Sequence, residues 1–459
     1  MPNDVGAAEQ RPTPGTPRSY HFPEVQRHQT TSGIDVIVAT VTRVPVVTLH
    51  YVIDGGAIYE PAGSAGTAQL TAKGIAEGTQ ALSGDDIAQR FELLGTSVEP
   101  DAGWEELELR STVMSSRLTQ AAALAAEVLT SPAFRADDLA RLQHERIAEL
   151  MQRDTEPRGL ADDAFSRVLY GPDSRLGFPI GGERETVREF GASRAREWHE
   201  RAFRPERMAV IVAGDVEADE AFAVMERIWG SWRATASPLL MPSGGHRPRR
   251  SATHFVAKTD AVQSEIRIGH TGPPRVNADY FELTVLNAIL GGLFGSRINL
   301  NLREAHGYTY GAFSGFDWRR DGSNFCVSTA VRSDATVQAV REIRSEISRI
   351  RDEPVSTSEL SLAVEHLEGV FPIRFETTAA MTNALASQLI FGLPRTYFDD
   401  YREKIRSVSA ADVQRVAQAH LRPGDLNLVV VGNAALKEEL TVLTDGDLVM
   451  EGLAADTEL

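Results

Sequence analysis

Residues 69–73 read Gln-Leu-Thr-Ala-Lys, which is the spacing of a helical metal motif with its reactive side chains replaced. In the inverted zinc motif His-x-x-Glu-His, two imidazoles bind zinc and the glutamate activates a water molecule. Gln69 and Lys73 stand at the two histidine positions, and Ala72 stands at the glutamate position. A neutral amide is a poor zinc ligand, an ammonium group repels the metal, and a methyl group accepts no proton. These positions predict a catalytic centre that has been lost.

The rest of the sequence offers no replacement metal site. His144 and His199 are each followed by a glutamate, but neither has a second histidine four residues further on. Cys326 is the only cysteine, which excludes an intramolecular disulfide and any site built from several cysteines. We therefore expect that this chain binds no cofactor and no zinc.

Size and charge narrow the classes of function. The chain has 459 residues, with 64 acidic and 47 basic side chains and a net charge of −17. Nucleic acid is an improbable partner for such a surface, because phosphates need concentrated basic residues. We expect no membrane partner, because no run of about 18 apolar residues is present. The first 18 residues lack the apolar core of a secretory signal, so the sequence predicts a cytoplasmic protein.

An internal repeat divides the chain into two halves. Segment 204–215 contains Arg-Pro and then Met-Ala-Val-Ile-Val-Ala-Gly-Asp, and segment 422–433, 218 residues later, contains Arg-Pro and then Leu-Asn-Leu-Val-Val-Val-Gly-Asn. A Pro- and Gly-rich stretch between the halves is typical of a linker. The predicted organisation is listed by residue range: a disordered lead-in 1–20, an N-terminal half 21–235, a linker 236–250, a C-terminal half 251–445 and a tail 446–459.

The local pattern within each half mixes strands with long helices. Apolar stretches predict strands at 46–53 and 264–270, and helical spacing predicts helices at 116–130 and 136–153. Ser83 and Asp86 have the spacing of a capping box, and Gly95 is a plausible end of the helix that follows. Strands combined with longer helices in this way indicate an α+β class.

Several segments, in order along the chain, resemble the pitrilysin/insulinase family of zinc peptidases, which includes the mitochondrial processing peptidases and bacterial two-subunit relatives. They are 55–61 (Gly-Gly-Ala-Ile-Tyr-Glu-Pro), 83–88, 170–171 together with 181–182 (Tyr-Gly and Gly-Gly), 290–297 (Leu-Gly-Gly-Leu-Phe-Gly-Ser-Arg) and 302–311 (Leu-Arg-Glu-Ala-His-Gly-Tyr-Thr-Tyr-Gly). The resemblance covers roughly residues 25 to 440. It implies two homologous halves, each a mostly antiparallel sheet packed with helices, arranged as a clam-like shell around a peptide-enclosing cavity.

The resemblance also implies substrate-binding residues in the second half. Arg303 and Tyr310 match a pair that grips the substrate carbonyl oxygen in relatives, and both side chains are suitable hydrogen-bond donors. Alternatively, Arg303 pairs with a carboxylate such as Glu304 or Asp317, and Tyr310 packs as a strand aromatic. Gly291 and Gly292 match a glycine-rich segment near the substrate cavity of relatives, and termination of a helix explains these glycines equally well.

One vestige of the zinc site is implied as well. Glu149, 76 positions beyond Lys73, lies where the family has its third zinc ligand. A solvated helix glutamate is the simpler interpretation, and a Lys73–Glu149 ion pair is a further expectation.

These residues favour one function over two others. The first is a non-catalytic subunit of a heterodimeric zinc metallopeptidase, inactive alone, which gives Arg303, Tyr310 and half of a chamber to a homologous zinc-motif-bearing partner. Its substrate would be an unfolded peptide. The alternative is a catalytically inactive peptide-binding or structural core-type scaffold protein. An active enzyme with relocated chemistry has no support, because Ala72 stands at the base position.

Overall fold

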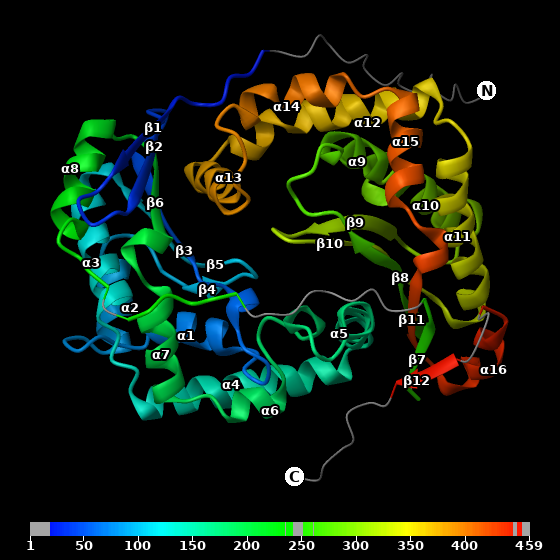
Figure 1. Ribbon diagram of the computed structural model, residues 1–459, viewed down its shortest axis with the longest axis horizontal. Coiled ribbons are helices and arrows are strands. Elements are labelled where there is room, and N and C mark those ends of the chain that lie inside the picture. Colours follow the sequence, from blue (N-terminus) through cyan, green and yellow to red (C-terminus); the bar gives the residue numbers. More distant parts are fainter. Residues whose placement is uncertain (1–18, 235, 242–250, 260, 444–447, 452–459) are drawn as a thin grey trace, which may run out of the picture.

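The computed structural model describes residues 19–234, 236–241, 251–259, 261–443 and 448–451, which form two halves of the same architecture (Figure 1). Each half contains one six-stranded sheet and a set of helices. The strands of the first sheet are β1 (Val25–Gln29), β2 (Asp35–Thr40), β3 (Val46–Asp54), β4 (Asp101–Ala102), β5 (Glu106–Met114) and β6 (Met208–Gly214). Those of the second are β7 (Thr253–Ala257), β8 (Gln263–Gly272), β9 (Ala312–Trp318), β10 (Ser323–Arg332), β11 (Asn427–Gly432) and β12 (Leu448–Glu451).

The helices follow the same division. Those of the first half are α1 (Thr67–Ile75), α2 (Gly84–Leu93), α3 (Leu118–Thr130), α4 (Ala136–Thr155), α5 (Pro157–Tyr170), α6 (Arg184–Arg188), α7 (Ala192–Ala202) and α8 (Ala218–Trp229). Those of the second are α9 (Tyr280–Asn287), α10 (Arg297–Asn299), α11 (Thr336–Asp352), α12 (Thr357–Val370), α13 (Thr378–Ile390), α14 (Tyr397–Arg406), α15 (Ala410–His420) and α16 (Lys437–Leu440). Two π-helical segments, η5 (Ala288–Gly292) and η6 (Leu300–Ala305), interrupt the region between α9 and β9.

Five strands of each sheet share one topology, and the predicted α+β class and duplication are confirmed. The sixth strand differs, because β1 pairs antiparallel with β2 whereas β12, from the end of the chain, pairs parallel with β7. The strand orders of the two sheets are β1-β2-β6-β3-β5-β4 and β12-β7-β11-β8-β10-β9. Within them β2–β6, β7–β11 and β7–β12 pair in parallel and the remaining pairs are antiparallel. Adding 218 to the bounds of β3 gives 264–272, almost the range of β8, and adding 218 to the bounds of α7 gives those of α15. The repeat thus extends over whole elements.

Each half sends one helix onto the sheet of the other half. Helix α5 packs on β8 and β11 of the second sheet, and α13 packs on β3 and β6 of the first (Figure 1). These two helices are repeat equivalents, because the bounds of α5 plus 218 give 375–388. Asp162 of α5 accepts a bond from Arg267 Nε at 2.7 Å, and the hydroxyls of Thr378 and Thr48 lie 2.7 Å apart. Each half therefore contributes one helix to the sheet of the other half, and the contacts of these two helices hold the halves together.

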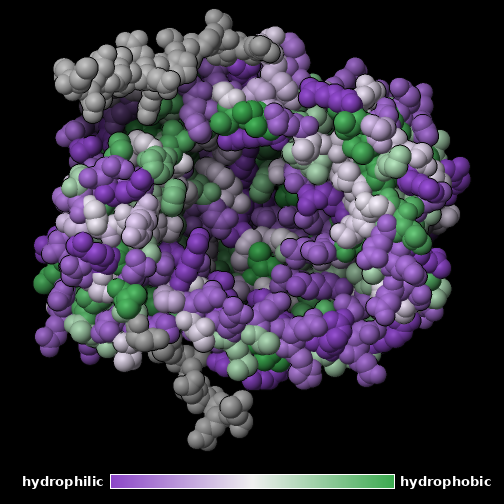
Figure 2. Space-filling model, turned by 180° about the vertical axis from the view of Figure 1, so that it is seen from behind, coloured by the Kyte–Doolittle hydropathy of each residue, from purple (hydrophilic) through white to green (hydrophobic). Residues whose placement is uncertain are grey.

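The two halves lie around the centre of the molecule, as the expected clam-like shell requires (Figure 1). The space-filling view shows the surface recessed at the centre of the molecule, between the two halves (Figure 2). Apolar residues of the inner face of the first sheet, Ile37, Val52 and Ile211 among them, belong to the same core cluster as residues of the second half. That shared core fixes which face of the first sheet looks towards the second half.

The ends and the linker differ in part from expectation. Most of the lead-in lies outside the described residues, but Tyr20, which was assigned to it, packs on Phe371 and Phe375 of the second half. Residues 448–451 were assigned to the tail and instead form β12, which pairs with β7 at the edge of the second sheet. Of the predicted linker, residues 236–241 are irregular and 242–250 lie outside the described part.

The apolar helical region 280–305 has the length and composition of a membrane span. It comprises α9, η5, α10 and η6, and most of its apolar window is buried inside the molecule. Leu283, Leu286 and Ile298 of this stretch are fully buried in the core of the second half. Burial of this kind is what the core helices of a folded domain show.

Candidate functional site

Helix α1, which carries the altered zinc positions, is fixed by a buried carboxylate at its first turn. Glu60 is 1% exposed and accepts hydrogen bonds from the backbone amides of Gly66 at 3.1 Å and Ala68 at 2.6 Å. Arg175, itself 6% exposed at its side chain, donates from Nε to the same carboxylate at 2.5 Å. A charge at this end also suits the helix dipole. The position of α1 therefore depends on Glu60 and does not require a bound metal.

The three altered positions are on α1 as predicted. Gln69 and Lys73 are partly exposed and lie one helical turn apart, whereas Ala72 is 1% exposed. Gln69 Nε2 donates a long bond of 3.4 Å to Asp101. None of these three side chains can act as the general base that activates water, because the side chain of Ala72 is a methyl group.

The vestigial Glu149 is paired with a different cation from the one expected. Its carboxylate accepts from Arg146 Nη1 at 2.9 Å, so the predicted Lys73–Glu149 ion pair is wrong. Arg146 also donates from Nε to the carbonyl of Gly181 at 2.9 Å. A Cβ added at Gly181 would lie 2.2 Å from Arg146 Nη2 and 2.3 Å from Gln69 Oε1, so both side chains reach this glycine. A guanidinium group thus lies beside the position of the former first ligand.

This arrangement does not fit zinc. Two of the three ligand positions carry an amide and an ammonium group, and the third carboxylate is neutralised by Arg146. Among the residues that the structure describes, no group of three His, Cys, Asp or Glu side chains could hold a metal ion.

Arg303 lies in η6 with its guanidinium over the ring of Phe294, 4.1 Å from the ring centroid. Its side chain is 31% exposed, and Nη2 is 3.5 Å from the carboxylate of Glu304. Arg303 thus pairs with Glu304, as the alternative interpretation predicts. Asp317, the other carboxylate of that interpretation, pairs with Arg319. Stacking on Phe294 fixes the plane of the guanidinium while leaving part of the group accessible.

Tyr310 is the most exposed large side chain near this segment. It is 93% exposed, so it does not pack as a strand aromatic. The backbone on both sides is anchored, because Thr309 Oγ1 bonds the carbonyl of Ala330 at 2.7 Å and accepts from the amide of Gly311 at 3.1 Å. A rigid backbone therefore presents a phenol that no part of the described chain uses.

The two glycines predicted to bind substrate have different surroundings. Gly291 is buried, and a Cβ there would lie 2.4 Å from Ser314 Oγ and 2.7 Å from Ser314 N, so this glycine permits close packing on β9. Gly292 is exposed at the end of η5. Subtracting 218 places Gly291 at Lys73. The glycine segment of the second half is thus the repeat equivalent of the altered zinc helix.

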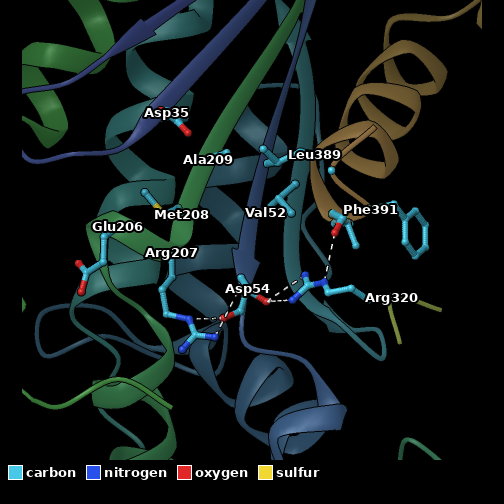
Figure 3. A pocket seen from close by; sticks show the side chains of 12 residues that line it. Asp35, Val52, Asp54, Glu206, Arg207, Met208, Ala209, Arg320, Leu389 and Phe391 are labelled. Carbon is cyan, nitrogen blue, oxygen red and sulfur yellow. Dashed lines mark hydrogen bonds and ion pairs between the residues drawn. The ribbon is translucent and has the colours of Figure 1, made fainter. Parts of the chain in front are cut away.

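Residues that the sequence analysis did not single out form a charged junction between the halves (Figure 3). Asp54, at the end of β3, accepts from Arg207 Nη2 at 3.2 Å and from Arg320 Nη1 at 3.1 Å. Arg320 belongs to the second half, and its backbone amide also donates to Glu105 at 3.0 Å. Asp54 and Arg320 are 266 residues apart, so no sequence spacing could have linked them. Arg146, by contrast, precedes Glu149 by three residues, and this helical spacing could have predicted their ion pair from the sequence alone.

Comparison with known proteins places these features in a family. The description "Insulinase (Peptidase family M16)" matches residues 36–172, and "Peptidase M16 inactive domain" matches residues 190–367. An uncharacterized zinc protease of Mycobacterium tuberculosis is 26% identical over 383 residues, 83% of this chain and 87% of that protein. The non-peptidase homolog YmxG of Helicobacter pylori is 21% identical over 395 residues, 85% of this chain and 89% of that protein.

Solved structures show the same fold. A peptidase M16 inactive domain from Pseudomonas fluorescens has a TM-score of 0.83 at 22% identity, covering 89% of this chain and 98% of that one. A protease from Helicobacter pylori has a TM-score of 0.84 at 17% identity, covering 90% of this chain and 100% of that one. The resemblance predicted from the sequence is therefore confirmed, and this chain belongs to the insulinase family, peptidase family M16.

Proposed function

We propose that this chain is the non-catalytic subunit of a heterodimeric zinc metallopeptidase. It would supply Arg303, Tyr310 and half of a peptide-enclosing chamber, and a homologous partner with an intact His-x-x-Glu-His motif would supply zinc. The altered positions Gln69, Ala72 and Lys73 support the first part of the proposal, because they leave this chain without ligands or base.

The observation that carries the proposal is the state of Tyr310. A tyrosine that is 93% exposed on an anchored backbone gains nothing for the stability of its own chain. Its hydroxyl is free to donate to a substrate carbonyl oxygen, and the Arg303 guanidinium, fixed by Phe294, offers further donors within the same segment. Donors aimed at such an oxygen stabilise the charge that develops during peptide hydrolysis.

The shape of the molecule supports an unfolded peptide as substrate. The halves lie around a central recess and are joined by helices α5 and α13, so access to it is limited by the polypeptide on both sides (Figures 1 and 2). An extended peptide has the narrow cross-section that suits such a recess, so we propose an unfolded peptide as the substrate.

The test is peptide hydrolysis by this chain, by a zinc-motif homologue from the same cell, and by their mixture. We expect activity only in the mixture and its loss with a chelator. In the mixture, Arg303→Ala and Tyr310→Phe should each lower kcat/KM by roughly 10²–10³-fold without weakening the complex. Arg332→Ala is the matched control and should have no effect, since the side chain of this exposed arginine pairs with Asp334 at 3.1 Å and with no other carboxylate of the described residues.

Two results would overturn the proposal. Full activity of the Arg303 and Tyr310 variants would remove their role in substrate binding. Absence of a complex and of activity in the mixture would favour the scaffold function instead, in which this chain binds peptides or proteins without any peptidase.

A further inference from the structure

A cavity of about 410 Å³ lies between the inner face of the first sheet and the end of α13 (Figure 3). Both halves contribute to it, and it is separate from the segment that holds Arg303 and Tyr310. Its lining residues from the second half are Arg320 and the segment 389–392. Those from the first half are Asp35, Val52, Asp54, Glu206, Arg207, Met208 and Ala209.

One end of the cavity carries two guanidinium groups around one carboxylate. Arg207 uses Nε for the backbone carbonyl of Asp54 and Nη1 for that of Leu239, at 2.6 and 2.7 Å. Arg320 uses Nε for the carbonyl of Ile390 at 3.3 Å. Each guanidinium has five N–H donors, and Asp54 offers a single negative charge to both groups. Glu206 and Glu105 also lie close enough to Arg207 and Arg320, respectively, to offset their charges. This end therefore has guanidinium N–H donors that no group of the described chain uses and that could bind a second carboxylate.

The other end carries the carboxylate of Asp35, which has a cation near it but no ion pair: Arg27 interacts with it electrostatically and donates its hydrogen bond to Gln388 at 3.0 Å. Asp35 accepts one bond from Gln29 Nε2 at 3.2 Å and forms no ion pair within the described residues. Glu206, also on the lining, is already paired with Arg204 at 2.6 Å. Figure 3 shows Asp35 at the opposite end of the cavity from Asp54. An ammonium group would find its counter-charge at Asp35.

The sheet register gives the distance between the two ends. Asp35 pairs with Ala209, Ala209 pairs with Val52, and Asp54 lies two residues further along β3 on the same face. Two strand spacings across and two residues along correspond to roughly 12 Å between the Cα atoms of Asp35 and Asp54. An extended tripeptide is about 10 Å long, so its two charged ends would reach both groups of side chains.

The walls between the ends are apolar. Val52 and Met208 line the side of the sheet, and Leu389 and Phe391 line the side of α13. Such walls favour apolar side chains on the ligand, since their burial contributes roughly 25 cal/mol per Å².

From this arrangement we propose that the cavity binds a short apolar peptide with free ends. Its C-terminal carboxylate accepts from the remaining N–H groups of Arg207 and Arg320, beside Asp54. Its α-ammonium group lies at Asp35, and its side chains contact the apolar walls. The ligand touches both halves and so holds the junction at Asp54 closed. This site does not depend on the proposed peptidase function, because binding requires no partner subunit.

The test is calorimetric titration of the full chain alone with trileucine, N-acetyl-trileucine and trileucine amide. Trileucine should bind, and capping either end should weaken binding about tenfold or more, because each cap removes a charge-assisted contact. Asp35→Asn should abolish the preference for a free N-terminus, and Arg320→Met the preference for a free C-terminus. Asp334→Asn, an exposed change outside the cavity, is the control and should leave all affinities unchanged.

The readouts separate a wrong proposal from a damaged fold. Thermal unfolding of each variant checks that the chain is intact, and Asp35→Asn is informative even if Arg320→Met unfolds, since Asp35 bonds only Gln29. Equal affinity for all three peptides, or no binding to the intact wild-type chain at millimolar concentration, would overturn the proposal.

Discussion

Replacing Glu106 by glutamine should stabilise the protein at high pH and leave it unchanged at low pH. Glu106 begins β5, in a run that also contains Glu105 and Glu108. Burial is the main reason that its pKa is raised from the ordinary 4.5 to about 7, and the charges of Glu105 and Glu108 raise it further. Glutamine has the shape of the protonated acid and cannot ionise.

The size of the effect follows from the pKa shift. Between the unfolded pKa near 4.5 and the folded pKa of about 7, the folded state holds more protons than the unfolded state. Stability therefore falls as the pH rises through this window, and the loss is complete above it. At 1.36 kcal/mol per pH unit the ionised carboxylate costs at most about 3 kcal/mol, which Glu106→Gln should recover at pH 8.5.

The assay is thermal unfolding of wild type and variant at pH 4.5 and pH 8.5. The melting temperature of Glu106→Gln should exceed that of wild type by several degrees at pH 8.5 and match it at pH 4.5. Glu92→Gln is the control, because Glu92 is exposed on α2 and forms no ion pair in the described chain. A gain that is equal at both pH values, or absent at pH 8.5, would show that Glu106 is not held in this way.

Three further predictions concern the altered zinc helix and its repeat equivalent. Glu60→Ala should destabilise the first half by about 3–5 kcal/mol in denaturant unfolding, because it leaves the Arg175 charge buried without its partner. Gly291→Ala should lower the melting temperature by the equivalent of about 1–3 kcal/mol, while Gly315→Ala, which meets nothing within 4 Å, should have little effect. Equimolar zinc should neither bind stoichiometrically by metal analysis nor raise the melting temperature, and about one zinc per chain would refute the assignment of Gln69 as a non-ligand.

Local features of the fold could be predicted from the sequence because they depend on neighbouring residues. The capping box of Ser83 and Asp86 is formed in both directions, and the strand predicted at 46–53 is β3. The duplication could be predicted as well, since both copies keep the same spacing from Arg-Pro to a buried strand. The capping box and the strand are each contained within a dozen residues, and the repeat is found by comparing two such short segments 218 residues apart.

Features that depend on distant parts of the chain were not predictable in this way. Helices α5 and α13 each pack on the sheet of the other half, and their hydrophobic periodicity does not reveal this. A helix that buries an apolar face has the same periodicity whichever sheet it packs on. Strand β12 has four residues, too short for an alternating pattern to identify it against a tail. The prediction of a Lys73–Glu149 pair is wrong for a different reason. Arg146 lies one turn from Glu149 on the same helix, so it forms the ion pair at a lower entropic cost.

The repeat explains how one chain can lose a metal site and keep its fold. Lys73 and Gly291 are equivalent positions, and neither half needs a metal there: α1 is fixed by Glu60, and Gly291 is packed on β9. Substitutions at the ligand positions of α1 therefore cost little stability, because they remove none of the contacts that hold the helix. The exposed phenol of Tyr310 is under a different constraint, since a side chain that is 93% exposed contributes little to folding. Its identity therefore does not depend on the packing of this chain, and it is available for the substrate contact proposed above.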